Sequence, residues 1–278
     1  SAEAADEEAE AVSDWTRRDQ KTQLDLLQKF NNPSVLFRAT EVYDALLGLL
    51  TNGDLEIQRS ALRAIFTWKN PSIRPYEENL LNLLDEARFK DELTILLQGE
   101  TQIQFQHRLD LMPVLLRVLY GRTISKKGAA SGRQGMHATR LIVLRTLSVE
   151  DCGAFLQIAL GDLADVNIVE DKLLEQDNFD TPIITVRKQL GFLNMIEGVL
   201  KELGTKVTPY TKQLLLAVMY CLVYSSRQLQ KSSDPDAMDE DTENVTQTSM
   251  LKVVRTTGFK CLNLLFTNDV NFDWSPYT

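Results

Sequence analysis

Apolar residues recur every three or four positions along most of the chain, which is the spacing of one face of an α-helix. The first such stretch runs from Val35 to Leu50, and the second runs from Ile57 to Trp68. Between them lies Asn52-Gly53-Asp54, in which the glycine suits a helix end and the aspartate suits a helix start. The same spacing predicts further helices after Pro75 and near residues 88–98, 108–121, 136–147, 152–163, 185–203, 208–229 and 247–266.

These helices, about ten in number, predict an all-α chain. Only 13 glycines and 8 prolines occur among 278 residues, too few for the regularly spaced turns of a β-sandwich or barrel. Helix pairs recur at intervals of about 40 residues, the period of HEAT and armadillo arrays. One pair cannot bury its apolar face alone, so we expect neighbouring pairs to stack into a HEAT/armadillo-like α-α superhelix, or solenoid. A globular helical bundle is the alternative.

The net charge of −9 comes from two acidic segments. Residues 1–14 contain six acidic side chains and no basic one, and residues 234–243 contain six more, again without a base. Without these twelve, 27 of the 39 acids remain against 30 lysines and arginines, so the rest of the chain is slightly basic. Blocks of like charge repel themselves and are usually disordered. We therefore expect an acidic tail or linker over residues 1–17, a HEAT-like helical region over 18–278, and an acidic disordered loop at 231–244.

The interval between Asp110 and Glu150 contains no acidic residue, and four of the 13 glycines fall in it. It predicts a basic helix–loop–helix with a Gly-rich loop at 121–136. Its lysines and arginines are Arg117, Arg122, Lys126, Lys127, Arg133, Arg140 and Arg145. Uncompensated positive charge attracts polyanions through counterion release, so these seven residues are candidate nucleic-acid contacts. The alternatives are contacts to an acidic protein partner, or a solvated loop whose arginines pair with acids of adjacent repeats.

The sequence offers no catalytic or metal-binding constellation, and we expect no cofactor. His107 and His137 are the two histidines, and neither has a cysteine or second histidine at zinc-ligand spacing. No nucleophile motif such as G-x-S-x-G occurs. The segment 121–128 lacks the second glycine of a phosphate-binding loop, because Lys126 takes its place. The chain is therefore predicted not to be an enzyme.

Cysteine usage and terminal sequence bear on the compartment. Cys152, Cys221 and Cys261 lie in or beside apolar runs, which predicts buried, reduced thiols and a reducing compartment. The first residues have neither the basic start nor the apolar core of a signal peptide. The longest apolar run, 214–224, is too short to span a bilayer. These features predict a soluble, intracellular protein.

Two stretches carry a resemblance to a known family. The first begins with TWKNP at 67–71 and ends with HRLDLMPVLLRVLYGR at 107–122, and the second is RKQLGFLNM at 187–195. They resemble the conserved region of the down-regulated-in-metastasis (DRIM) family. Its members are very large HEAT-repeat proteins associated with small nucleolar RNA and the small-subunit processome. The LYGR string corresponds to residues 119–122 here, and the resemblance does not decide whether it contacts RNA or a neighbouring repeat.

The resemblance implies a non-catalytic scaffold, since the family has no catalytic residues to carry over. Its implied role is in precursor ribosomal RNA processing and small-subunit assembly, within a nucleolar ribonucleoprotein particle. The implied partners are precursor ribosomal RNA, small nucleolar ribonucleoprotein components and pre-ribosomal assembly proteins, with no membrane and no small-molecule substrate. The alternative is a HEAT-repeat adaptor of the transport-receptor or phosphatase-scaffold type, which would bind proteins and no RNA.

Overall fold

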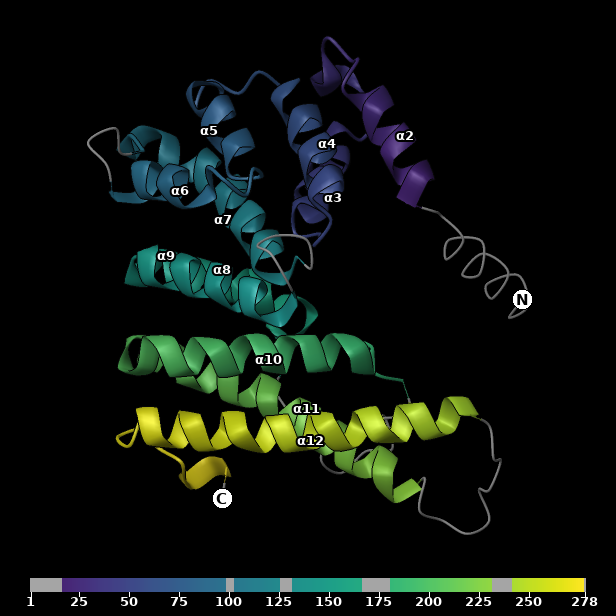
Figure 1. The fold of residues 1–278 in the computed structure, drawn as a ribbon, viewed down its shortest axis with the longest axis vertical. Coiled ribbons are helices and arrows are strands. Elements are labelled where there is room, and N and C mark those ends of the chain that lie inside the picture. Colours follow the sequence, from purple (N-terminus) through teal and green to yellow (C-terminus); the bar gives the residue numbers. More distant parts are fainter. Residues whose placement is uncertain (1–16, 99–102, 126–131, 167–180, 232–241, 278) are drawn as a thin grey trace. The chain divides into compact units, whose positions relative to one another are not determined.

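The computed structural model describes residues 17–98, 103–125, 132–166, 181–231 and 242–277 (Figure 1). Within these ranges every regular element is helical, and eleven of the elements are α-helices, which confirms the predicted all-α, HEAT-like class. The chain divides into two compact units, residues 1–146 and 147–278. The hydrophobic pattern predicted one helical region over 18–278 and contained no sign of this division.

The first unit consists of short helices joined by tight turns. Its elements are α2 (Arg17–Leu27), η1 (Pro33–Val35), α3 (Ala39–Leu50), α4 (Leu55–Phe66), η2 (Arg74–Tyr76), α5 (Glu77–Asn82), α6 (Phe89–Gln98), η3 (Phe105–His107), α7 (Arg108–Ile124) and α8 (Gly132–Thr146). Helix α4 packs against α2 and α3, α7 packs against α3, α4 and α8, and α6 packs against α8. Successive helices therefore bury their apolar faces against neighbours, as repeat stacking requires.

The turn between α3 and α4 forms as its sequence predicts. The Asp54 carboxylate accepts a hydrogen bond from the Glu56 backbone N–H at 2.9 Å, which caps the start of α4. The Asn52 side chain in turn accepts one from the Asp54 N–H at 2.8 Å. On α4, Ala61 and Leu62 are fully buried. The short turn therefore joins α3 and α4 into a packed helix pair.

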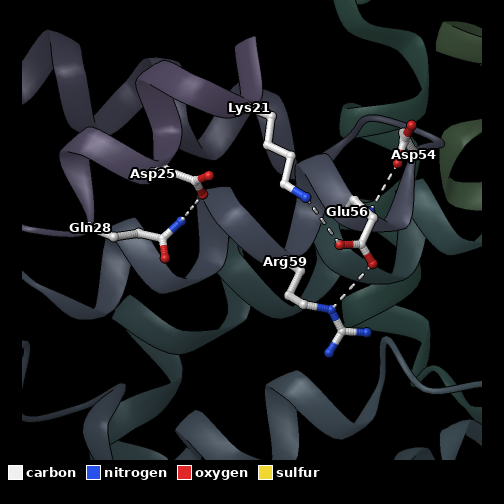
Figure 2. Close-up of polar contacts among 6 residues, drawn as sticks. All are labelled: Lys21, Asp25, Gln28, Asp54, Glu56 and Arg59. Atoms are coloured by element: carbon white, nitrogen blue, oxygen red, sulfur yellow. Dashed lines mark hydrogen bonds and ion pairs between the residues drawn. The ribbon is translucent and has the colours of Figure 1, made fainter. Parts of the chain in front are cut away.

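Polar contacts at the surface accompany the packing of α2 on α4, and Figure 2 shows them. Lys21 of α2 lies 3.9 Å from the Glu56 carboxylate, and Arg59 lies 3.8 Å from the same group one turn along α4. All three side chains are substantially exposed, so each pair contributes little to stability. The buried apolar residues, rather than these charges, hold α2 in place.

The second unit consists of longer helices. Its elements are α9 (Val149–Leu160), η4 (Gly161–Leu163), α10 (Val186–Leu203), η5 (Gly204–Tyr210), α11 (Thr211–Lys231), α12 (Thr242–Asn268) and η7 (Ser275–Tyr277). Helix α12 packs along both α10 and α11 (Figure 1). Gly258 permits close approach of α12 to α11, since a Cβ there would lie only 2.7 Å from a methyl carbon of Leu222.

Several boundaries differ from those that the sequence predicted. The helix expected from Val35 begins at Ala39, because Arg38 has a left-handed backbone with φ of 57°. Helix α2 was not predicted, because it is strongly polar. The basic loop expected at 121–136 is shorter, since α7 continues to Ile124 and α8 begins at Gly132. The acidic tail and acidic loop fall almost entirely outside the described residues.

The three cysteines are buried and unpaired in the second unit, as predicted. Burial raises the pKa of Cys152 to about 11 and that of Cys261 to about 12, and it also raises the pKa of Cys221. These thiols are therefore protonated and unreactive at neutral pH. Across the described ranges, no helix combines the length and apolar character needed to cross a membrane.

Candidate nucleic-acid interface

The seven basic residues predicted as nucleic-acid contacts lie on or between α7 and α8. Arg117 and Arg122 belong to α7, and Arg140 and Arg145 belong to α8. Arg133 also lies in α8, but its side chain is outside the described part of the structure, and Lys126 and Lys127 lie outside the described residues altogether. The structure therefore places four of the seven side chains.

Arg122 is buried inside the first unit. Its side chain is 1% exposed, and its Nη2 lies 2.8 Å from the Glu86 carboxylate. Its guanidinium also lies over the Phe89 ring, 4.7 Å from the ring centre, in cation–π contact. Arg122 thus ties α7 to the start of α6 and to the turn before it. Arg122, predicted as a nucleic-acid contact, therefore lies in a buried ion pair and is turned away from solvent.

Gly121, beside Arg122, also has a packing role. A Cβ at this position would lie 2.6 Å from the Leu50 carbonyl oxygen and 2.7 Å from that of Asn52. The Gln58 side chain fills the same junction, and its amide donates hydrogen bonds to the carbonyl oxygens of Leu50 at 2.6 Å and Val118 at 3.1 Å. Only glycine lets α7 approach the α3–α4 turn this closely. In the LYGR string, Gly121 and Arg122 therefore pack against neighbouring helices.

His107, the first residue of the longer string that ends in LYGR, also makes packing contacts. The Tyr76 hydroxyl lies 3.1 Å from His107 Nδ1 and accepts a hydrogen bond from the Gln104 backbone N–H at 3.0 Å. The Tyr76 and His107 rings meet edge to face, with centres 5.7 Å apart. These contacts hold η3 and the start of α7 against η2. The His107 ring therefore contributes to the packing between these elements.

Arg117 lies at intermediate depth, and Arg140 is buried. Arg117 is partly buried and donates a hydrogen bond to the Pro113 carbonyl oxygen at 3.0 Å within α7. Arg140 is only 8% exposed. Burial lowers the pKa of Arg140, an effect that Tyr120 opposes, and burial likewise raises the pKa of Tyr120 against the opposing charge of Arg140. Arg140 therefore contributes to the α7–α8 packing, whereas the Arg117 side chain bonds within its own helix.

Arg145 is the one described candidate that is surface-exposed. It lies in the last turn of α8, where a positive charge also suits the negative end of the helix dipole. The structure thus separates the four described candidates by depth: Arg122 and Arg140 point inward, Arg117 is intermediate and Arg145 faces solvent. The sequence did not reveal this separation, because all of these residues lie in one acid-free interval.

Two further features concern metal ligands and cavities. In the ranges that the structure describes, no three His, Cys, Asp or Glu side chains come together as metal ligands would.

The second unit contains an apolar cavity of about 480 Å³ between α11, α12 and η7. Sequence reasoning missed it, although Phe259 and Phe266, seven residues apart on one helix face, were a signal for it.

Comparison with known proteins places nearly the whole chain in one family. Residues 14–278 match the family model described as U3 small nucleolar RNA-associated protein 20, N-terminal. The protein of that name from Saccharomyces cerevisiae is 31% identical over 265 residues, covering 94% of this chain and 10% of the yeast protein. The protein of that name from Schizosaccharomyces pombe is 31% identical over 271 residues, covering 95% of this chain and 10% of its own length.

The chain therefore spans about a tenth of the length of the relatives that it matches. The match includes the HR…LMP…LYGR string and the RKQLGFLNM string, so the family resemblance inferred from those motifs is confirmed. The chain belongs to the family of U3 small nucleolar RNA-associated protein 20.

Proposed function

We propose that the protein is a non-catalytic helical scaffold in ribosome biogenesis, acting within the nucleolar small-subunit processome. The observation that carries this proposal is the family match over residues 14–278, together with relatives named for association with U3 small nucleolar RNA. The stacked helices described above support a scaffold, since such surfaces hold partners by extended contact. Its partners would be precursor ribosomal RNA, small nucleolar ribonucleoprotein components and pre-ribosomal assembly proteins.

The RNA-facing surface would extend from the α7–α8 connection along the solvent side of α8. Arg145 is exposed in the last turn of α8, and Lys126, Lys127 and Arg133 lie between it and the end of α7 in sequence. No acidic residue occurs between Asp110 and Glu150, so this part of the sequence is basic. Such residues would bind phosphates rather than read bases, because phosphate contacts carry affinity without sequence information.

Arg117 and Arg140 would act indirectly, by holding α7 and α8 in register beneath that surface. The burial of Arg140 supports this division of roles, as does the hydrogen bond that Arg117 makes within α7. Arg122 has no place on the RNA surface, because Glu86 and Phe89 already occupy its guanidinium.

The test is binding of the full 278-residue chain to structured precursor ribosomal RNA across a salt series. A variant in which Lys126, Lys127, Arg133 and Arg145 become Gln should bind more weakly than the unmodified chain. The slope of log affinity against log salt should fall by about 0.7–0.9 for each phosphate that is no longer neutralised.

The matched control changes four exposed bases elsewhere in the first unit to Gln, namely Lys29, Arg63, Arg74 and Lys90. This variant has the same net charge as the first, so it should bind nearly as the unmodified chain does. Equal losses of affinity from both variants would mean that the chain attracts RNA only by its overall charge. No loss from either would favour a protein-binding adaptor without RNA contact.

A further inference from the structure

The second unit carries an apolar groove on the outer side of α11 and α12. The cavity of about 480 Å³ has Leu215 and Met219 of α11 along one side and Phe259 and Phe266 of α12 along the other. Phe259 is 56% exposed and Phe266 is 54% exposed. Large aromatic side chains at this exposure, gathered around one hollow, indicate a binding surface rather than scattered surface residues.

Helix geometry shows how the groove is oriented along α12. Phe259 and Phe266 are two turns apart on the same face. Val254, Cys261 and Leu265 are buried and lie about 120–160° around the helix axis from Phe259, where α12 packs along α10 and α11. The groove face is therefore the outward face of α12, and no described element of this unit other than η7 covers it.

The C-terminal turn forms one end wall of the groove. Trp274 and Tyr277 line the cavity, and Trp274 packs against Phe266 with ring centres 5.3 Å apart. The indole N–H donates a hydrogen bond to the Asp269 carbonyl oxygen at 3.2 Å. The Asp269 carboxylate in turn accepts one from the Thr211 hydroxyl at 2.8 Å, which anchors the wall to the start of α11. The wall is therefore fixed by several contacts.

The groove is basic at its other end. Lys252 and Arg255 are exposed, and both lie on the same face of α12 as Phe259, within two turns of it. No acidic residue occurs between Glu243 and Asp269, or between Glu202 and Asp234, so α11 and nearly all of α12 contain only positive charges. The acidic residues that border this interval are Glu243, in the first turn of α12 and nine residues before Lys252, and Asp269, just after the helix at the other end of the groove. The surface therefore combines an apolar floor with a one-sided positive charge.

We propose that this groove binds an amphipathic α-helix of a partner protein, with acidic side chains at the end that meets Lys252 and Arg255. Two antiparallel helices bordering an apolar floor accept the apolar face of a third helix, with anchors at i, i+3 or i+4, and i+7. The stretch from Arg255 to Phe266 is about 16 Å long, which matches three turns of such a helix. The basic end gives the bound helix its direction. This inference does not depend on the RNA surface proposed for α7 and α8.

The test uses the full chain and a designed peptide of about 14 residues, with leucines every third or fourth position and glutamates elsewhere. Fluorescence anisotropy of the labelled peptide measures its binding. The double variant Lys252→Glu, Arg255→Glu should weaken binding by about tenfold or more. The double variant Phe259→Ser, Phe266→Ser should weaken it to a similar degree, and both variants should keep the thermal melting transition because the changed residues are exposed.

The matched control is Lys260→Glu, an exposed lysine of the same helix that lies about 100° around the axis from Phe259. It should change peptide affinity by no more than about twofold. A companion peptide with lysines in place of glutamates should bind more weakly than the acidic peptide. Equal binding of the two peptides, or equal weakening by Lys260→Glu, would overturn the proposed charge selection.

Two further outcomes would overturn the choice of partner. If the chain dimerises in sedimentation experiments and the Phe259→Ser, Phe266→Ser variant is monomeric, a second copy of the chain occupies the groove. If a single-stranded RNA homopolymer binds in a manner that Lys252→Glu, Arg255→Glu abolishes and Phe259→Ser, Phe266→Ser does not affect, the basic end binds nucleic acid instead. The proposal is supported if both double variants weaken peptide binding and neither of these two results is found.

Discussion

Two regions of this protein have the same charge pattern in sequence and opposite arrangements in space. The interval 111–146 in the first unit and the interval 244–268 in the second both lack acidic residues. In the first, Arg122 and Arg140 turn inward and are buried. In the second, Lys252 and Arg255 stay exposed beside Phe259, which is itself exposed. An acid-free interval is therefore not the same as a basic surface.

The difference arises from what surrounds each helix. Helix α7 packs against α3, α4 and α8, so most of its circumference is covered and its arginines must find partners inside. Arg122 does so through Glu86, an acid 36 residues away that no local sequence pattern would connect to it. Among the described elements, α12 packs mainly along α10 and α11, and Lys252, Arg255 and Phe259 lie on its exposed side. Burial decides which charges are available to a partner.

Among the substitutions that test this comparison, Arg122→Ala should have the largest effect on the free energy of unfolding. The substitution removes a buried side chain, its ion pair with Glu86 and its cation–π contact with Phe89. We expect the free energy of unfolding to fall by about 3 kcal/mol, as for other large buried side chains. Urea denaturation measures this change. Arg88→Ala, at an exposed arginine two residues after Glu86, is the control and should cost less than about 0.5 kcal/mol.

The next largest effect is expected for Gly121→Ala. The added methyl group would collide with the carbonyl oxygens of Leu50 and Asn52 and with the Gln58 side chain, so α7 would have to move away from the α3–α4 turn. We expect the free energy of unfolding to fall by about 2 kcal/mol, typical of overpacking. Gly48→Ala in α3 is the matched control, because its Cβ would meet nothing within 4 Å. That control should be neutral or stabilising by about 0.5–1 kcal/mol, since alanine favours the helix. Similar destabilisation by the two variants would refute the close-approach role of Gly121.

A third prediction concerns the pH dependence of stability, to which the cysteines of the second unit contribute. All three cysteines lie in the second unit, and their pKa values are raised by burial above the ordinary value of 9.0. Buried neutral thiols stabilise the fold fully below about pH 9, and this contribution disappears as the pH rises from about 9 toward about 12. Unfolding free energy should therefore fall over this alkaline range by more in the unmodified chain than in Cys261→Ala.

Thiol labelling gives an independent measure of the same burial. At about pH 8 the native chain should react slowly with a thiol reagent, and all three cysteines should react promptly in concentrated urea. Rapid labelling of the native chain would mean that the second unit opens more readily than its packing implies.

The smallest effect is expected for Phe259→Ser. Because this ring is more than half exposed, its removal should change the free energy of unfolding by less than about 0.5 kcal/mol. Phe155→Ser, at a fully buried ring of the same unit, is the contrasting control and should cost about 3–5 kcal/mol. A large destabilisation by Phe259→Ser would show that the groove serves the fold itself, and would remove the reason to assign it a partner.

Helix periodicity predicted most of the fold because the buried residues follow it closely. The predicted helices near 88–98 and 185–203 agree with α6 and α10 to within one residue at each end. The turn at Asn52-Gly53-Asp54 formed through the caps that its residues predict. Helix α2 was not predicted, because its few apolar residues are surrounded by charged and polar ones. Among its described side chains, only Leu24 is buried. The position of α2 depends on contact with α4, which is too far away along the chain for a local hydrophobic pattern to indicate the contact.

The candidate site was predicted only as a set of residues, not as a surface. Composition identified the basic interval, but the depth of each arginine depends on long-range contacts such as Arg122 with Glu86. The family resemblance located the LYGR string, and its role in packing became clear only from the Gln58 hydrogen bonds and the space around Gly121. The apolar groove required two helices and the C-terminal turn to come together, which no single segment reveals.

The most direct test of this account compares Arg122→Gln with Arg145→Gln in two measurements on the full chain. One is the free energy of unfolding, and the other is the salt dependence of binding to precursor ribosomal RNA. We predict that Arg122→Gln destabilises the chain by about 2 kcal/mol and leaves the salt slope unchanged at temperatures where it is folded. We predict that Arg145→Gln leaves stability unchanged and lowers the slope by about 0.7–0.9. The reverse assignment, or a lower slope from both, would contradict the division between inward and outward arginines.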